Sequence, residues 1–260
     1  TFLAVFDTIE DATNTVSGLI GRGIVPAALE MIDQVVIGAV EEAFQVGFPL
    51  DAEAVLIIEL DGLEAGMESQ AERVIEVCKQ NNLRDLRKTR DSKERDLIWK
   101  SRKRAFGALG RLSPSYYTQD GVVPRTRLPD IMRVIKSVQE KYDLMIGNVF
   151  HAGDGNIHPC ICYDENDPEM VKKVLDASTE ILKACIEMGG SVTGEHGIGA
   201  EKMDFMPLLF SENDIQAMVN VKHAFDEADL CNPGKVFPTD RSCIGCGVEE
   251  LKAMKRQAAM

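Results

Sequence analysis

The chain has 260 residues and a formal net charge of −13, from 29 Lys and Arg against 42 Asp and Glu. Hydrophobic residues make up 45% of it, which suits a buried core and excludes a disordered or collagen-like chain. The acidic excess excludes general binding to a nucleic acid phosphate backbone, which requires Lys and Arg. No apolar run reaches the roughly 18–20 residues that span a bilayer, and no signal peptide pattern is recognised.

Apolar runs and helical stripes predict an irregular alternation of strands and helices. The chain opens at Thr1 and enters an apolar run at once, as expected for a piece of a longer protein. Strands are predicted at 2–6, 29–32, 54–60, 115–119, 145–150 and 156–163. Helices are predicted at 8–19, 35–46, 64–82, 91–109, 128–138, from an N-cap at Asp167 to a stop at Gly189, and in the stretch after Ser211.

The order of these elements indicates the fold class. At least one tight hairpin is expected, and no Gly-rich strand-to-helix turn of the dinucleotide or phosphate-binding type occurs. The prediction is an α+β fold: a mostly antiparallel sheet covered by helices on one side, with a helical C-terminal segment that packs as an appendage.

Seven cysteines at irregular spacing indicate no disulfide framework and favour a reducing, intracellular compartment. Cys78 and Cys185 fall on apolar helical stripes and are expected to be small core residues. Cys243 and Cys246 form a CxxC near the end of the chain. Two readings stay open for this pair, an inert tail or half of a metal site.

Residues 150–159 combine two histidines with a hairpin signal. Asp154-Gly155 between apolar runs is typical of a two-residue turn. A turn centred there pairs His151 with His158, so that their Cβ atoms lie about 4.5–5.5 Å apart on one face. Two imidazoles at that spacing can share one divalent ion, whereas a one-residue slip would separate them. The alternative is a pair of ordinary surface or core histidines.

A second segment, residues 191–199, places Glu195 and His196 between glycines that allow close approach of the backbone. Glu195 would add a carboxylate to the two histidines, and such a set leaves metal positions open for substrate. His196 would stand beside it as a general base. The alternative is a glycine-rich loop with solvated side chains. The fourth histidine, His223, is expected to be an ordinary surface or packing residue.

Three motifs in order, HAGDGNIHP (151–159), TGEHGIG (193–199) and NPGKV (232–236), resemble the C-terminal half of the FAD-linked 2-hydroxyacid dehydrogenases. This group, within the vanillyl-alcohol oxidase superfamily, contains the glycolate oxidase FAD-linked subunit, D-lactate dehydrogenase and D-2-hydroxyglutarate dehydrogenase. The resemblance covers residues 1–238 and leaves 239–260 as a tail. It implies a ferredoxin-like substrate and metal domain, and an N-terminal FAD-binding domain that is absent from this chain.

The resemblance also implies roles for matching residues. His151, His158 and Glu195 match the ligands of a divalent metal, which is zinc, iron or manganese depending on the member. His196 matches the base that takes the 2-hydroxyl proton while a hydride passes to FAD. Removing both from a 2-hydroxy acid is easier when the hydroxyl is polarised by a Lewis acid.

Two further residues match binding positions. Arg102, in WKSR (99–102), matches an arginine that holds the substrate carboxylate, for which its bidentate fork is suited. Residues 84–104 are locally basic, with ten Lys and Arg against four Asp and Glu, although a solvated helix face is an alternative explanation. Asn232 lies where the family chain returns to the flavin.

The resemblance implies oxidation of glycolate or D-lactate. The lysine and asparagine that hydroxyglutarate members carry near Thr118 and Cys160 are missing, which argues against a dicarboxylate. The isolated chain is expected to be inactive without its FAD domain. The expected partners are that domain and an iron–sulfur or electron-transfer flavoprotein subunit, and the expected location is the cytoplasm, with membrane contact only through a partner. Two alternatives remain: a flavin-independent metal-dependent hydrolase and an inactive assembly subunit.

Overall fold

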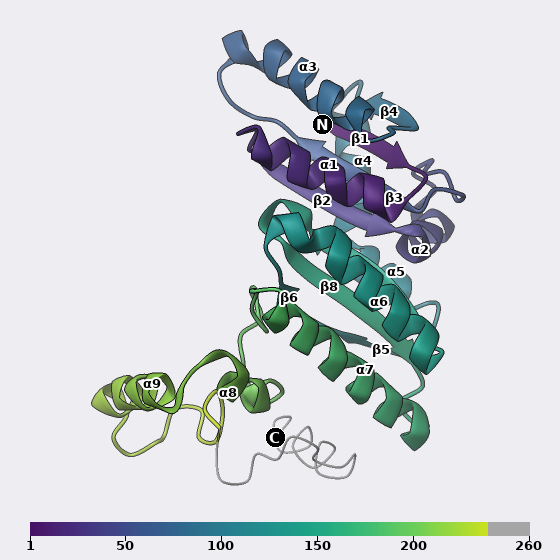
Figure 1. The fold of residues 1–260 in the computed structure, drawn as a ribbon. Coiled ribbons are helices and arrows are strands. Elements are labelled where there is room, and N and C mark those ends of the chain that lie inside the picture. The colour runs from purple at the N-terminus through teal and green to yellow at the C-terminus, as the bar shows by residue number, and fades with distance from the viewer. Residues whose placement is uncertain (239–260) are drawn as a thin grey trace.

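An antiparallel sheet of eight strands forms the centre of the computed structural model, which describes residues 1–238 (Figure 1). Its order is β4-β1-β3-β2-β7-β8-β5, and β6 also pairs with β8. The strands are β1 (Phe2–Phe6), β2 (Ala28–Asp33), β3 (Ala54–Glu59), β4 (Asp85–Lys88), β5 (Ser115–Thr118), β6 (Gly121–Val122), β7 (Met145–His151) and β8 (Asn156–Tyr163). The α+β class and the antiparallel sheet are therefore confirmed.

The helices follow the predicted stripes, with two differences. The short helix α8 was not predicted. The predicted helix at 91–109 breaks at Arg104 into α4 and α5. Asp167 caps α7 as predicted, because its carboxylate accepts from the amides of Glu169 and Met170. The helices are α1 (Ile9–Gly21), α2 (Gln34–Phe44), α3 (Glu64–Gln80), α4 (Ser92–Lys103), α5 (Ala105–Leu109), α6 (Leu128–Tyr142), α7 (Pro168–Glu187), α8 (Met206–Leu209) and α9 (Glu212–Phe225). Short 3-10 turns are η1 (Arg125–Arg127), η2 (Ala152–Asp154) and η3 (Met203–Phe205).

The sheet consists of two halves that repeat one ferredoxin-like topology. In the first half, the order β4-β1-β3-β2 arises from two strand–helix–strand units, and α2 is inserted between β2 and β3. In the second half, β5 and β6 together take the place of the first strand. The place of its fourth strand is taken by a single antiparallel bridge between Val122 and Ser191. The halves join where β2 pairs with β7.

Helices cover both faces of the sheet, so the predicted one-sided cover is wrong. Helices α1, α3, α6 and α7 enclose the larger apolar core on one face, which includes the buried Cys78 and Cys185. Burial raises the pKa of each of these two thiols to about 12, as expected for inert core residues. Helices α2, α4 and α5 enclose a second core with Val149 and Cys160 on the opposite face.

The hairpin of β7 and β8 differs in register from the prediction. His151 pairs with Asn156, and His158 pairs with Val149. The turn has four residues because Ala152–Asp154 form η2, and only Gly155 adopts a positive φ (74°). The shift is two residues, so both histidines still point to the same face as diagonal neighbours.

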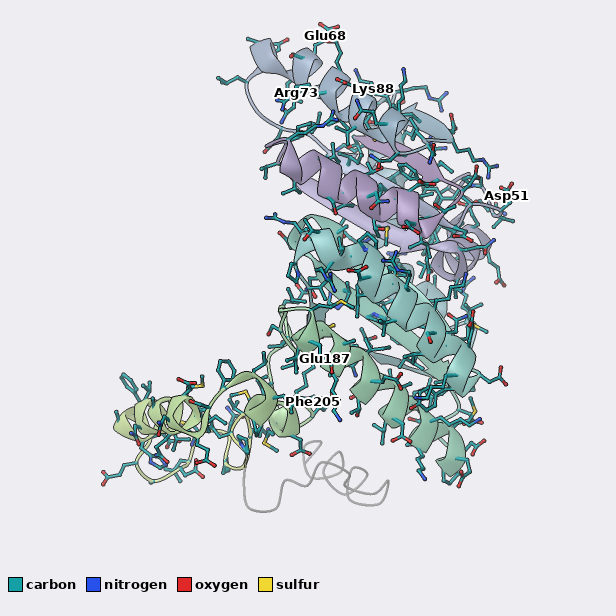
Figure 2. The ribbon with its side chains drawn as sticks, in the orientation of Figure 1. Asp51, Glu68, Arg73, Lys88, Glu187 and Phe205 are labelled. Atoms are coloured by element: carbon teal, nitrogen blue, oxygen red, sulfur yellow. The ribbon has the colours of Figure 1, made fainter. Side chains whose placement is uncertain are left out.

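The C-terminal segment is helical, as predicted, and α8 and α9 lie beside the sheet rather than on it (Figure 1). Helix α9 has no buried residue, and His223 is exposed on it. The charged side chains of Asp51, Glu68 and Lys88 are exposed around the first half of the chain (Figure 2). Among residues 1–238, no helix has the length and apolar character to cross a bilayer. The predicted tail, with Cys243 and Cys246, lies outside the described residues.

Candidate metal and catalytic site

Three side chains that are distant in sequence meet on the face of the sheet that α4 and α5 cover. His151 ends β7, His158 lies in β8, and Glu195 comes from the loop after α7. Nε2 of His151 lies 3.5 Å from Oε1 of Glu195, and Nε2 of His158 lies 3.1 Å from the same oxygen. One ligand atom from each residue falls within 4.8 Å of the other two. The structure thus brings together all three residues predicted as metal ligands.

The state of His158 indicates what this site can hold. Its Nδ1 is 3.0 Å from the carbonyl oxygen of Gln119, which can only accept, so Nδ1 carries the proton. Burial lowers the pKa of His158, which favours the neutral ring with a lone pair on Nε2. That Nε2 is buried and makes no hydrogen bond. A bare nitrogen facing a carboxylate oxygen leaves two acceptors without a proton between them, and a metal cation satisfies both.

His151 is held by a carboxylate behind it. Its Nδ1 is 2.9 Å from Oε1 of Glu30, whose other oxygen accepts from the guanidinium of Arg102 (2.6 Å). The hydrogen bond to Glu30 raises the pKa of His151. Burial acts to raise the pKa of Glu30, but the His151 hydrogen bond and the Arg102 charge outweigh it and lower that pKa. A carboxylate behind a histidine is a frequent arrangement in metal sites, where it fixes the ring and its tautomer.

His196 stands beside this cluster. Its ring stacks on that of His158, with centroids 5.0 Å apart and planes at 19°, and its Nε2 is 3.7 Å from Oε1 of Glu195. The loop comes this close because Gly194 has no side chain: a Cβ there would lie 2.6 Å from the amide carbon of Asn156. Gly194 therefore serves the close approach that the sequence predicts, whereas a Cβ at Gly197 or Gly199 would meet no atom within 4 Å.

Within residues 1–238, two sets of side chains are close enough to hold a metal, and Asp120 with His158 and His196 is the second. Oδ2 of Asp120 already accepts from the hydroxyl of Thr193 and from three backbone amides, whereas Glu195 faces only histidines. Burial acts to raise the pKa of Asp120, but these hydrogen bonds and the Lys202 charge hold it well below its usual range. The set with His151, His158 and Glu195 is therefore the better candidate.

Neither of the two predicted binding residues belongs to the set of three candidate ligands. Arg102 is buried on α4 and donates to Glu30, and its Nε has no hydrogen-bond partner. Asn232 lies in an exposed turn with a φ of 51°. The amide of Val236 donates to the carbonyl of Gly199 (2.7 Å), which ties the end of the NPGKV segment to the Glu195 loop.

Sequence reasoning missed Glu30, Gln119 and Asp120. Glu30 is a charge between apolar residues in the middle of a strand, which is itself a signal for a buried partner. Asp120 stands in an Asp-Gly pair, which is typical of an ordinary turn, so the sequence does not indicate that its carboxylate is buried and binds backbone amides.

Comparison with known proteins gives a consistent result along nearly the whole chain. Residues 1–236 match the family described as "FAD linked oxidases, C-terminal domain". The chain is 44% identical over 245 residues to "Glycolate oxidase subunit GlcD" of Escherichia coli (strain K12), covering 94% of this chain and 49% of that protein. It is 35% identical over 240 residues to the protein of the same name in Bacillus subtilis (strain 168), covering 92% and 51%.

Solved structures show the same fold at low sequence identity. The match to p-cresol methylhydroxylase with substrate bound has a TM-score of 0.67 at 13% identity, and covers 94% of this chain and 53% of that one. The chain spans about half the length of the relatives that it matches.

Proposed function

The chain belongs to the family of FAD-linked oxidase C-terminal domains, and from this we propose that it is the substrate- and metal-binding half of a flavin-dependent dehydrogenase. The enzyme would oxidise a small 2-hydroxy acid, glycolate or D-lactate, to the 2-oxo acid. The names of the two bacterial relatives favour glycolate. The observation that carries the proposal is the bare, buried Nε2 of His158 facing Glu195 beside a second histidine.

His151, His158 and Glu195 would hold a divalent zinc, iron or manganese ion, which when bound supplies a Lewis acid that polarises the substrate hydroxyl. His196 would take the hydroxyl proton on its ring, since it is the imidazole next to this set with its side chain half exposed. Glu30 would keep Nε2 of His151 turned toward the metal, because it accepts the proton on Nδ1.

Arg102 would bind the substrate carboxylate with a donor that Glu30 does not use, since Glu30 accepts from Nη2 alone. FAD, bound by a domain outside these residues, would accept the hydride from C2. Asn232 would approach the flavin, since the NPGKV segment is tied to the Glu195 loop. We propose the FAD domain and an iron–sulfur or electron-transfer flavoprotein subunit as partners, and the cytoplasm, with membrane contact only through a partner, as the location.

Metal analysis tests the proposal directly. Protein purified without chelators should contain one divalent metal per chain, and His151→Ala should lose it. His223→Ala is the matched control, because His223 is exposed on α9 and should leave the metal unchanged. With the FAD domain supplied, glycolate- or D-lactate-dependent dye reduction should fall by more than about 100-fold in His151→Ala and not in His223→Ala.

Three results would contradict the proposal. Absence of bound metal in the purified wild-type protein would contradict the proposed metal site. Ester hydrolysis by the chain without flavin would favour a metal-dependent hydrolase. Absence of turnover with the FAD domain present, together with capture of an electron-transfer subunit, would favour an inactive assembly subunit.

A further inference from the structure

A two-residue break between β5 and β6 lies next to the site. Both strands pair with β8 in one register, so Gln119 stands opposite Pro159 and Asp120 opposite His158. The amide of Gln119 donates to the carbonyl of Pro159 (3.0 Å), but Pro159 has no N–H to return the bond. The carbonyl of Gln119 is therefore available, and it accepts from Nδ1 of His158. The first residue of the break thus fixes the tautomer of one ligand.

The second residue of the break, Asp120, binds the loop that carries Glu195 and His196. Asp120 is fully buried. Its Oδ2 accepts from the hydroxyl of Thr193 (2.7 Å) and from the amides of Gly194 (3.0 Å), Glu195 (3.2 Å) and His196 (2.9 Å). Consecutive amides pointing at one carboxylate force the backbone to curl around it, as in anion-binding nests.

Lys202 completes the arrangement from the far end of the same loop. Its ammonium group is buried, lies 3.5 Å from Oδ2 of Asp120 and donates to the backbone carbonyl of Asp120 (3.1 Å). A buried charge requires such compensation, because desolvation otherwise disfavours it. The pair therefore anchors both ends of the segment from Thr193 to Lys202 to the strand break.

We propose that Asp120, supported by Lys202, is the positioning residue that places Glu195 and His196 against His158. This inference rests on the proposed function, because it assigns Asp120 to the assembly of the same metal site. Asp120 itself stays outside the reaction: its carboxylate binds backbone amides, and the side chains of Glu195 and His196 remain available. The break in the strand is thus the element that joins the hairpin and the loop.

The test compares Asp120→Asn with Asp167→Asn. Both replace a carboxylate that accepts from backbone amides, but Asp167 caps α7 away from the site. Two readouts apply to the whole chain: hydrogen exchange of the amides in residues 193–199, measured by mass spectrometry, and the dissociation constant of Co²⁺. Asp120→Asn should accelerate loop exchange and weaken Co²⁺ binding by about 10- to 100-fold. Asp167→Asn should change neither quantity.

Thr193→Val provides a second variant if Asp120→Asn fails to fold. It keeps the carboxylate and removes a hydroxyl that donates to Asp120 and accepts from the amide of Gly197 (2.8 Å), so the exchange readout is taken from the amides of Glu195 and His196. It should accelerate loop exchange and weaken Co²⁺ binding in the same direction, by a smaller factor. Unchanged loop exchange, or faster exchange with unchanged Co²⁺ affinity, would overturn the role of Asp120. A wild-type chain that binds no Co²⁺ would contradict the proposed function instead, and loop exchange alone would then decide whether Asp120 holds the loop.

Discussion

The two halves of the sheet share a topology but differ in how regularly they complete it. In the first half, the first strand is the continuous apolar run of β1, and a full strand, β4, closes the edge. In the second half, the corresponding first strand is interrupted at Gln119 and Asp120, and the fourth strand is reduced to the bridge at Ser191.

The functional groups gather at these two irregularities. The interruption supplies the partner of His158 and the carboxylate that holds the loop. The missing strand leaves the chain after Ser191 without ladder pairing, so it can carry Glu195 and His196 toward β8. The first half supplies Glu30 behind His151 but no proposed metal ligand, and is otherwise a scaffold. The second half departs from regular structure where a site needs buried polar contacts.

The largest expected effect tests the scaffold role of the first half. Phe6→Ala removes a fully buried ring from β1 and should lower the free energy of unfolding by about 3–5 kcal/mol. The Zn²⁺ affinity of the folded protein should stay the same, because the first half provides no proposed ligand. Urea unfolding and calorimetric titration measure the two quantities. A large loss of Zn²⁺ affinity in the folded variant would break the division between scaffold and site.

The second prediction contrasts buried carboxylates in the two halves. Burial raises the pKa of Asp33, at the end of β2, to about 6, although the amides of Val36 and Asn148 donate to it. Asp120, by contrast, has a lowered pKa because it faces more donors and Lys202. The folded protein therefore favours protonated Asp33, and this contribution is complete below about pH 4 and lost as the pH rises through 6.

The size of this loss follows from the shift of the pKa. Wild-type protein should lose about 2 kcal/mol of stability between pH 4 and 7 relative to Asp33→Asn, which has no ionisable group at this position. Urea unfolding of both proteins across this range measures the difference. Parallel stability curves would show that Asp33 ionises as freely in the folded chain as in the unfolded chain.

A smaller effect is expected from the close approach of the Glu195 loop. Gly194→Ala would push a Cβ against the Asn156 amide and displace the loop. Zn²⁺ affinity should fall by about 10-fold, as for a disturbed supporting residue, which titration calorimetry can detect. Affinity equal to that of the wild type would mean that the loop does not need this contact.

The smallest effect is expected at a glycine of the first half, which is the counterpart of Gly194. Gly38 lies inside α2, and a Cβ there would meet no atom within 4 Å. Gly38→Ala should therefore raise the free energy of unfolding by about 0.5–1 kcal/mol through helix propensity, with unchanged Zn²⁺ affinity. Destabilisation in urea unfolding would contradict this account of α2.

Local patterns predicted the parts of the fold that depend on local interactions. The strands β1, β3 and β8 were predicted because each buries nearly every residue of a short run. The start of α7 was predicted because Asp167 is a good N-cap residue. The strands β4 and β6 were not predicted, since each is short and its pairing depends on residues far along the chain. The predicted register of the β7–β8 hairpin was wrong because an Asp-Gly pair also suits a four-residue turn.

The three candidate metal ligands could be proposed from the sequence because histidine is scarce, two of the four fall in one hairpin, and Glu195 lies in a glycine-rich segment. The residues behind the ligands were not, because Glu30 and His151 are separated by 121 positions and meet only across β2 and β7. For Arg102, the family resemblance implies a substrate carboxylate as partner, but only the fold shows that the carboxylate of Glu30 already accepts from the guanidinium.

The most direct measurement is anomalous diffraction at the zinc absorption edge from crystals of the chain grown with Zn²⁺. We expect one anomalous peak, about 2.0–2.2 Å from Nε2 of His151, Nε2 of His158 and a carboxylate oxygen of Glu195. The peak should be absent from crystals of Glu195→Gln. No peak among these three side chains in the wild type, or a peak bound by Asp120 in place of Glu195, would contradict the account.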